Sequence, residues 1–405
     1  MTDIAAEIPS FPLARDPRCP FQPPPAYTRL RAEQPVSRAT LWNGQTVWLI
    51  TRHADQRKIL IDPRFSADTT RPGYPWVSPA QAATLGKTRS FVFMDDPEHN
   101  RYRSKLTREF TVRRIDALRP RIQQIVDGLI DDILAAEGPV DLVPALALPL
   151  PTLVICELLG VPYRDHAFFQ QANSVLVSRD CTPEQAKTAR LELQDYLDSL
   201  VEAKEREPGD DLISRLVIEQ VRPGHLTRAE LCSTAVLLLL AGHEPTSNMI
   251  SLGVLALLQH PEQLAELRDS DDPKVAANAV EELLRYLTIG HSGVRRVAME
   301  DVELNGQIIR AGEGVVLLGD AANRDEAVFD DPGRLDIHRQ ARHHISFGHG
   351  IHQCLGASLT RTELQIVYPT LLRRIPGLRT AIPLEEIPFR HDMAIYGVHE
   401  LPVTW

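Results

Sequence analysis

The chain has 405 residues, 43% of them hydrophobic and 24% charged, an ordinary globular composition that excludes a disordered or fibrous protein. Its 44 basic and 54 acidic residues give a net charge of −10. This argues against nucleic acid as the main partner, because binding phosphate requires a basic surface. The cysteines are scattered and never spaced as CxxC, so we expect neither a disulfide framework nor a cysteine-rich zinc site; they are Cys19, Cys156, Cys181, Cys232 and Cys354.

The N-terminus lacks the pattern of an export signal, since Met1–Leu13 carries acids and prolines instead of a basic stretch followed by an apolar one. No run of about 18 uncharged apolar residues is present, so we expect no membrane span and a cytoplasmic protein. Length alone favours two or three domains, but the chain shows no repeat and no Gly/Ser-rich linker. We therefore expect one large domain over residues 1–405, with a proline-rich arm over residues 1–24.

In chain order, local composition predicts a helix opened by Pro25 after the arm, and then a β-branched, aromatic strand over Thr46–Thr51. A helix is predicted over His53–Leu60. The stretch Ser66–Phe93 is rich in Pro, Gly and Thr, and is predicted as a long loop of the kind that often forms a lid or a binding loop.

Further along, apolar spacing predicts helices over Arg119–Ala136, Pro151–Leu159 and Pro183–Arg206. Short strands are expected over Val302–Leu304 and Val315–Leu318 around an Asn-Gly turn. The chain from Pro383 onward alternates loosely and is also predicted as strands. The fold class is therefore mainly α with a smaller β region.

A long helix is predicted from the capping box Thr227-x-x-Glu230 to the stop at His260-Pro261. Its middle is apolar on every face, so we expect it to cross the centre of the protein. Pro245 has no N–H to donate, so the helix is expected to kink or open there. The neighbouring Glu244 and Thr246 are costly to bury unless they are paired, which favours a functional role for both.

The segment His343–Gly356 (HHISFGHGIHQCLG) is rich in glycine, which lets backbone approach another group closely, and helical spacing resumes just after it. Cys354 thus stands at a helix N-terminus, where the thiolate that metals bind is favoured. Zinc fits less well, because structural zinc takes its ligands as spaced pairs and no second pair is present. A dinucleotide loop would need a preceding strand and a further glycine. One thiolate in such a loop suits haem iron, which takes a single axial protein ligand here.

Residues Phe347–Gly356 resemble the haem-binding signature FGxGxHxCxG of the cytochromes P450. Glu282–Arg285 matches the ExxR motif of that family, and Arg334 resembles the third member of its Glu-Arg-Arg network. Ala241-Gly242-x-Glu244 is similar to the oxygen-binding part of the family's long helix. The resemblance is nearest to soluble actinobacterial members that tailor secondary metabolites or oxidise foreign compounds, and weaker to the fungal nitric oxide reductase branch.

This resemblance implies a single α-rich domain that holds haem b (iron protoporphyrin IX), with Cys354 as the proximal iron ligand that favours O–O cleavage. It also implies that four side chains contact the haem propionates, although Arg295 could replace Arg296; the four are His99, Arg103, Arg296 and His352. The other implied haem-contacting residues are Ala241, Gly242, Phe347 and Gly356.

The resemblance makes Glu244 and Thr246 the catalytic residues of the long helix, but the sequence departs from the family between them. Pro245 stands where most members have a threonine whose hydroxyl helps to deliver protons. Protons must then come through water from Glu244, from Thr246 after local unwinding, or from a hydroxyl of the substrate. We favour water or the substrate at this stage, so Thr246→Ala is expected to change coupling only mildly.

Electrons are expected from NAD(P)H through a ferredoxin reductase and a ferredoxin, because the chain carries no flavin or iron–sulfur segment. A local basic patch suits an acidic ferredoxin; it comprises Arg101, Arg103, Lys105, Arg108, Arg113 and Arg114, with Glu109 as its one acid. The substrate pocket is expected to be mainly apolar. Its expected lining is the loop from Arg71 to Phe93, Leu238, Ala241, Gly242, Ile289, Val294 and Met393–Ile395.

The leading hypothesis is a haem-thiolate monooxygenase that hydroxylates or epoxidises a mostly hydrophobic organic substrate. Oxidative coupling of phenol or indole rings, or reduction of nitric oxide, is an alternative that depends less on an acid–alcohol relay. A third alternative, kept open by Pro245, is a protein of this fold that binds haem or another ligand without turnover.

Overall fold

The computed structural model describes residues 8–405 apart from 80, 83–89, 166, 170, 173–181, 392 and 394, so Cys181 lies outside the described residues. The chain forms two compact units, each assembled from separate stretches. The first, here termed the sheet unit, comprises Met1–Arg103, Asn278–Leu355 and Phe389–Tyr396. The second, the helical unit, comprises Ser104–Ala277, Gly356–Pro388 and Gly397–Trp405.

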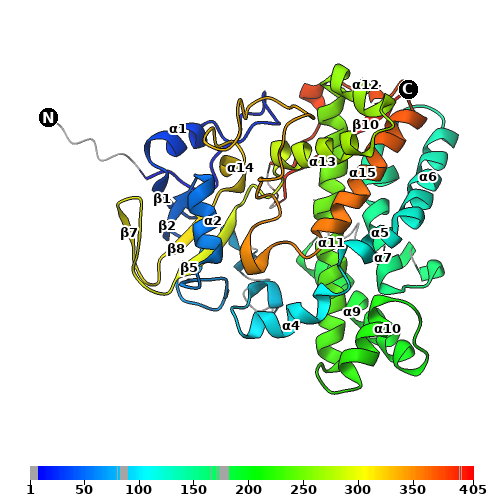
Figure 1. The fold of residues 1–405 in the computed structure, drawn as a ribbon, viewed down its shortest axis with the longest axis horizontal. Helices are drawn as coiled ribbons and strands as arrows, with labels where there is room; N and C mark the ends of the chain where they lie inside the picture. The colour runs from blue at the N-terminus through cyan, green and yellow to red at the C-terminus, as the bar shows by residue number, and fades with distance from the viewer. Residues whose placement is uncertain are drawn as a thin grey trace. The chain divides into compact units, whose positions relative to one another are not determined.

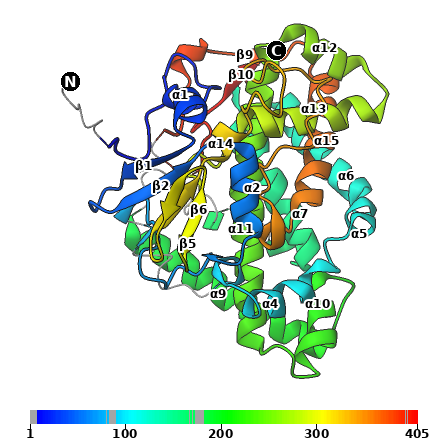
Figure 2. The same ribbon diagram turned by 60° about the vertical axis from the view of Figure 1, so that its left-hand side comes forward.

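The sheet unit is built on a five-stranded sheet in the order β1-β2-β8-β5-β3, of which Figure 2 labels β1, β2 and β5. The strands are β1 (Val36–Thr40), β2 (Thr46–Ile50), β3 (Phe65–Ser66), β5 (Val294–Ala298) and β8 (Gly314–Leu317). β2 and β8 run parallel, whereas the other neighbours are antiparallel. The sheet therefore pairs strands near the start of the chain (β2 and β3) with strands more than two hundred residues later (β8 and β5). Such long-range pairing forms only when the whole chain folds.

Apolar side chains cover both faces of this sheet. Trp48 and Leu49 are adjacent in β2 and lie in two different core clusters, as the period of two in a strand requires. α2 (His53–Ile61) packs into the cluster of Trp48, and α1 (Ala26–Glu33) packs into the cluster of Leu49. The predicted helices and strand of this region are confirmed.

The smaller elements of the sheet unit include the hairpin predicted at the Asn-Gly turn. Asn305 and Gly306 both have positive φ angles, 49° and 74°, which this tight turn requires. They join β6 to β7. The remaining elements are β6 (Val302–Leu304), β7 (Gln307–Ile309), α14 (Gly319–Ala322) and the 3-10 turns η1 (Phe91–Phe93) and η5 (Gly350–His352). Two helices cross the unit boundary along the chain, α4 (Glu98–Thr107) and α13 (Pro273–Leu287).

The helical unit is organised around α11, which packs on α7, α9 and α15 (Figure 1). Its helices are α5 (Val112–Ala117), α6 (Arg119–Ala135), α7 (Pro149–Leu159), α9 (Pro183–Arg206), α10 (Leu212–Leu216), α11 (Arg228–Leu258), α12 (Pro261–Asp269) and α15 (Ala357–Arg374). Shorter helical turns are η2 (Val143–Ala147), η3 (Tyr163–Asp165), η4 (Val217–Val221) and η6 (Leu384–Glu386). A small sheet has the order β4-β10-β9, from Val140–Asp141, Pro402–Thr404 and Arg379–Thr380.

α11 begins as the capping box predicts. The Thr227 hydroxyl accepts from the Glu230 amide at 3.2 Å, and the Glu230 carboxylate accepts from the Thr227 amide at 2.8 Å. The helix is crossed closely by α15, because a Cβ at Gly253 would lie 2.0 Å from the hydroxyl oxygen of Tyr368. Only glycine fits at this contact, which fixes the register of the two helices.

The expected opening of α11 at Pro245 does not occur, because a single missing hydrogen bond is small beside the packing of a helix of 31 residues. The stretch from Pro383 onward forms a 3-10 turn, irregular backbone and the strand Pro402–Thr404 alone, among the described residues. Its loose alternation was too weak a pattern to specify pairing partners.

Candidate functional site

The loop that precedes α15 presents Cys354 at the surface of the sheet unit. The thiol is exposed and not in a disulfide, and the Cys354 amide donates to the Phe347 carbonyl at 2.8 Å, which closes the loop. Gly348 and Gly350 have φ angles of 71° and 75°, and a Cβ at Gly350 would lie 2.6 Å from the Leu60 carbonyl oxygen. The glycines of this segment therefore serve the shape of the loop itself.

The other cysteines described in the structure have different chemistry or a different setting. Burial raises the pKa of Cys156 to about 12 and that of Cys232 to about 12, so neither is a thiolate at neutral pH. Cys19 is exposed but lies in the proline-rich arm, outside the glycine-rich loop. Cys354 is thus the cysteine whose setting suits a metal ligand.

Four cationic or N–H-bearing side chains gather beside the cysteine loop, all within the sheet unit. The rings of His99 and His352 lie 4.3 Å apart. Burial is the main cause that lowers the pKa of His352, to about 3, and Arg296, His99 and Arg103 lower it further. Arg103 donates to the backbone carbonyl of Gln353, next to the cysteine. The sequence predicted all four, and the structure brings them together.

This cluster has one buried nitrogen without a hydrogen-bond partner and one buried cation, and both fit an anion. His99 is 2% exposed and its Nε2 has no hydrogen-bond partner, which costs about 1–3 kcal/mol. Arg296 is buried, and burial lowers the pKa of its guanidinium; among the described residues it forms no ion pair. Buried cations and N–H groups are retained where they meet a partner. The cluster could therefore hold the carboxylates of a haem whose iron is bound to Cys354.

Behind this loop lies the buried ion pair predicted from ExxR. Arg285 donates twice to the Glu282 carboxylate at 2.7 Å, and both side chains are fully buried. The prediction that Arg334 is the third member of this network is wrong, because its side chain is exposed and binds Asp336 at 3.1 Å. Arg339 takes this place and donates to Glu282 at 3.2 Å. Arg334 offers only its backbone carbonyl to the network, because acidic neighbours hold its side chain at the surface.

A functional residue that the sequence analysis missed is Asn323, which joins the Arg285 network to the cysteine loop. Its side-chain amide donates to Thr288 and Ser346, each at 2.8 Å, and its carbonyl oxygen accepts from the Ile345 amide at 2.9 Å. Its backbone carbonyl accepts from Arg285 at 2.9 Å. Sequence patterns carry no signal for this role beyond an asparagine that follows a short apolar run.

The next two residues extend the same support. Arg324, buried, donates to the carbonyls of Phe21 and Tyr286 at 3.0 and 2.9 Å. Asp325 accepts from the His53 amide at 2.9 Å, at the start of α2. We name Asn323, Arg324 and Asp325 the buried triplet. It fixes the cysteine loop, the arm and α2 to one another within the sheet unit.

The helical unit carries the predicted residues of the long helix. Ala241 is exposed, and Gly242 and Glu244 are half-buried, whereas Thr246 is buried and its hydroxyl lies 3.4 Å from that of Thr360. The Asn248 side chain donates to the Glu244 carbonyl at 2.8 Å. α11 thus exposes small side chains at its middle, where a helix packed on all sides would have large ones.

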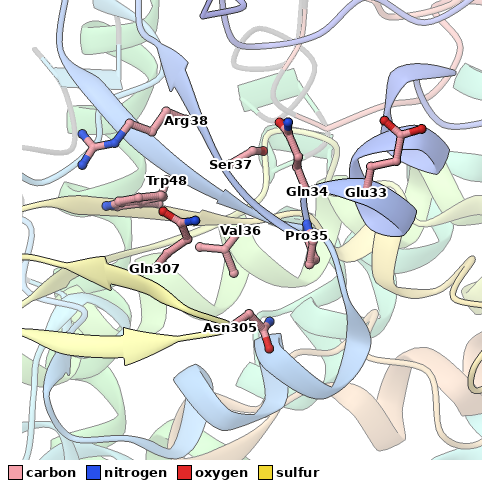
Figure 3. Close-up of a pocket in the computed structure, with 9 residues that line it drawn as sticks. All are labelled: Glu33, Gln34, Pro35, Val36, Ser37, Arg38, Trp48, Asn305 and Gln307. Carbon is pink, nitrogen blue, oxygen red and sulfur yellow. The ribbon is translucent and has the colours of Figure 1, made fainter. Parts of the chain in front are cut away.

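The expected substrate lining includes residues of both units, and part of it, within 83–89 and at residue 394, lies outside the described residues. It stays a prediction. A separate pocket of about 370 Å³ lies beside β1 and the β6–β7 hairpin (Figure 3). Its walls are polar, and the Arg38 and Trp48 side chains in them already bind Glu313 at 3.1 and 2.7 Å. No predicted site residue lines it, so we do not place the substrate there.

The chain was compared with known proteins. The cytochrome P450 family model matches residues 32–375, which include parts of both units. Cytochrome P450 GfsF of Streptomyces halstedii is 55% identical over 405 residues, covering 100% of this chain and 98% of that protein. The 20-oxo-5-O-mycaminosyltylactone 23-monooxygenase of Streptomyces fradiae is 45% identical over 397 residues, covering 98% of this chain and 92% of that protein.

Solved structures of similar proteins also superimpose on this chain over nearly its whole length. The crystal structure of GfsF has a TM-score of 0.94 and covers 98% of this chain and 100% of that chain. The structure of the mycinamicin VIII C21 methyl hydroxylase MycCI of Micromonospora griseorubida, bound to mycinamicin VIII, has a TM-score of 0.89 at 42% identity. The match covers 98% of this chain and 100% of that chain.

The fold and the match define a haem-dependent monooxygenase. The chain belongs to the cytochrome P450 family, and its relatives include Streptomyces members of that family. Among the residues that the structure describes, every helix is too short or too polar to cross a bilayer.

Proposed function

We propose that this enzyme hydroxylates or epoxidises a mostly hydrophobic secondary metabolite or foreign compound, in the cytoplasm, with dioxygen and with electrons from NAD(P)H through a ferredoxin reductase and a ferredoxin. The observation that carries the proposal is an exposed Cys354 whose loop is fixed by Phe347, next to a cluster in which the buried His99 Nε2 has no hydrogen-bond partner and Arg296 is buried. The relatives support the substrate class, because their names describe oxidation of mycinamicin VIII and of a mycaminosyltylactone.

In this proposal the haem supplies the chemistry of dioxygen activation, and the chain's residues hold and orient it. Cys354 is the thiolate ligand, and Phe347 and Gly356 shape the loop around it. His99, Arg103, Arg296 and His352 would bind the propionates through charge-assisted hydrogen bonds. Ala241 and Gly242 would contact the haem, and Glu244 and Thr246 would be the groups that manage protons.

The test is the absorption spectrum of the reduced protein with carbon monoxide. We expect a strongly red-shifted Soret band in the natural protein, because thiolate ligation pushes electron density onto the iron. Cys354→Ser should abolish the shift and turnover, whereas Cys19→Ser, which changes another exposed cysteine, should keep both. A Cys354→Ser protein with unchanged colour, gas binding and turnover would disprove the assignment.

For the electron donor, we propose docking at the exposed basic side chains of residues 100–114, among them Arg101, Arg108 and Arg113. The one acid of this stretch, Glu109, is buried and already binds Arg215 at 2.7 Å, so it does not offset the patch. Arg114 lies 3.6 Å from the same carboxylate and contributes less. A positive patch on a chain of net charge −10 supports an acidic partner.

A further inference from the structure

A carboxylate just ahead of α4, Asp96, contacts one of the side chains of the donor cluster beside the cysteine loop. Its Oδ1 lies 3.2 Å from Nδ1 of His99 and accepts from the Asn100 amide at 3.1 Å. The Asp96 side chain is 50% exposed, whereas that of His99 is 3% exposed. A carboxylate at the surface thus contacts a ring that is buried.

The two nitrogens of the His99 ring have different surroundings. Nδ1 faces Asp96, whereas Nε2 has no hydrogen-bond partner among the residues that the structure describes. The ring centroid lies 4.3 Å from that of His352, so the ring borders the cluster that fits an anion. Since the bond that one ring nitrogen makes sets the role of the other, Asp96 decides what Nε2 can offer to that anion.

A ring between two carboxylates needs a proton on each nitrogen. Neutral imidazole has one N–H and one lone pair, so one of the two carboxylates would face a lone pair. A second proton removes this repulsion. Imidazole is more basic than a carboxylate by about two pKa units, so the ring takes that proton in preference to the carboxylate.

We propose that Asp96 is a positioning residue for haem, which holds His99 with Nδ1–H toward its own carboxylate, so that Nε2 takes up one proton from water when a haem propionate binds there. One N–H bond forms at Nε2, water loses one proton, and nothing is oxidised or reduced. Asp96 touches neither haem nor substrate and acts only through His99. The inference rests on the proposed function, because it requires the haem.

The charged groups around His99 favour a neutral ring before a propionate is bound. Burial is the main cause that lowers the pKa of His99 from its ordinary value of 6.5; Asp96 raises it, and Arg103 and Arg296 lower it further. A bound propionate adds a negative charge beside Nε2 and offsets the charges of the two arginines. Both effects raise the pKa of His99, so the haem protein carries the additional proton.

The other groups near the ring leave this proton count unchanged. On η5, burial lowers the pKa of His352 to about 3, so its ring stays neutral. On η1, the Phe91 ring lies 6.3 Å away and has no charge. Asp95 is turned to β3, where it accepts from the Ser66 hydroxyl and, at 2.8 Å, from the Ala67 amide.

The first experiment measures how haem partitions at equilibrium between the holoprotein and apomyoglobin from about pH 6.5 to 8.5. A protein that binds one more proton with haem than without it loses haem affinity by up to about tenfold per pH unit in this range. His99→Gln keeps an N–H donor without a titratable proton, so it should lose this slope. His225→Gln, an exposed histidine of the helical unit, is the control.

The pH dependence of myoglobin itself cancels in this comparison, because it is the same for every variant. Equal slopes for the natural protein and His99→Gln would overturn the proposal.

The second experiment separates the charge of Asp96 from its role at the start of α4. Asp96→Asn keeps an oxygen that accepts from the Asn100 amide but has no charge. Its slope should move to lower pH by about one unit, and its haem affinity at pH 8 should fall several-fold. Asp272→Asn, an exposed carboxylate that accepts from the Lys274 amide, is the matched control. Haem loss from Asp96→Ala with an unchanged Asp96→Asn would reduce Asp96 to a helix cap and refute the proposal.

The third experiment reads the ring directly and needs no turnover. In the reduced carbon monoxide form, protein labelled with nitrogen-15 in its histidines should show His99, assigned from His99→Gln, as an imidazolium at pH 7.5, with two similar nitrogen shifts. Two widely separated shifts mean a neutral ring and overturn the proposal.

The carbon monoxide spectrum distinguishes this inference from the proposed function. A red-shifted band together with a neutral His99 refutes the role of Asp96 and leaves the haem-thiolate assignment intact. Absence of the band from the natural protein refutes the proposed function, and the role of Asp96 with it.

Discussion

Arg295 and Arg296 are neighbours in β5, yet their side chains have opposite surroundings. Arg296 is buried and points its guanidinium into the cluster with His99 and His352, while Arg295 binds Gln81 and lies 6.0 Å from the ring of Tyr74. The sequence left both arginines as candidates for binding haem. Alternation along a strand shows that their side chains point to opposite faces of the sheet, but not which face lies toward the site. The structure favours Arg296.

Arg296→Ala is expected to weaken haem retention about tenfold or more, since a hydrogen bond to a charged group contributes about 1.5–3 kcal/mol. Transfer of haem to an excess of apomyoglobin measures this retention. Arg295→Ala is the control, because the Arg296 guanidinium donates to the backbone carbonyl of Arg295, which that variant keeps. Equal haem loss from both variants would contradict the assignment.

The burial of Glu363, a residue of α15, leads to a prediction about stability. Its pKa is raised to about 8 from an ordinary value of 4.5, so between these values the folded protein binds more protons than the unfolded chain. The free energy of unfolding contributed by this group must therefore fall as the pH rises through that window. Glu363→Gln should remove this slope and gain stability relative to the natural protein from pH 5 towards about 8. Urea unfolding at several pH values measures it, and parallel pH profiles for the two proteins would contradict it.

At the scale of elements, the buried triplet connects the cysteine loop, the N-terminal arm and the start of α2, and no sequence motif predicted these connections. Asn323 binds both the turn after α13, through Thr288, and the irregular backbone that enters the cysteine loop, through Ser346 and Ile345. Loss of its side chain leaves these buried groups without partners. The triplet therefore positions the cysteine without touching it.

Asn323→Ala is expected to lower the free energy of unfolding by about 1–3 kcal/mol for the buried groups left unpaired. Because the loop loses its support first, the red-shifted carbon monoxide band should disappear at a lower urea concentration than the helical circular dichroism signal. Asn43→Ala, at an exposed turn, serves as the control. Simultaneous loss of both signals, at the midpoint of the natural protein, would show that Asn323 has no such role.

How far sequence predicts an element depends on whether its determinants are local. The start of α11 follows from Thr227 and Glu230 alone, and α9 has the bounds that its apolar spacing predicts. The exchange of Arg334 for Arg339 and the contact of Thr246 with Thr360 depend on segments that meet only in the folded chain. Motif spacing thus identified the residue types of the site, while their partners required the structure.

At the scale of the whole molecule, charge is distributed unevenly. The chain has a net charge of −10, yet residues 100–114 expose several basic side chains and bury the one acid of this stretch, Glu109. Such a contrast steers an oppositely charged partner and affects the rate of association more than the strength of the final complex.

Arg108→Glu combined with Arg113→Glu should slow electron transfer from an acidic ferredoxin about tenfold at low salt, because steering by charge changes association rates by 10-fold or more. Stopped-flow reduction of the protein at increasing ionic strength measures this, and the salt dependence should weaken in the variant. Arg190→Glu, an exposed basic residue of α9, is the control. Reduction rates unchanged by the double substitution would place the docking surface elsewhere.

The bond between Arg324 and the carbonyl of Phe21 makes the N-terminal arm part of the interior. The same guanidinium is shared with Gln22 at 3.0 Å and with Tyr286, and Arg15 of the arm reaches Asp320 at 3.3 Å. A chain shortened to begin at Ala26 would leave Arg324 without Phe21 and Gln22, and Asp320 without Arg15. Purification tags and fusion partners therefore belong ahead of residue 8 or after Trp405, and a trimmed version chosen for convenience should aggregate or lose its colour.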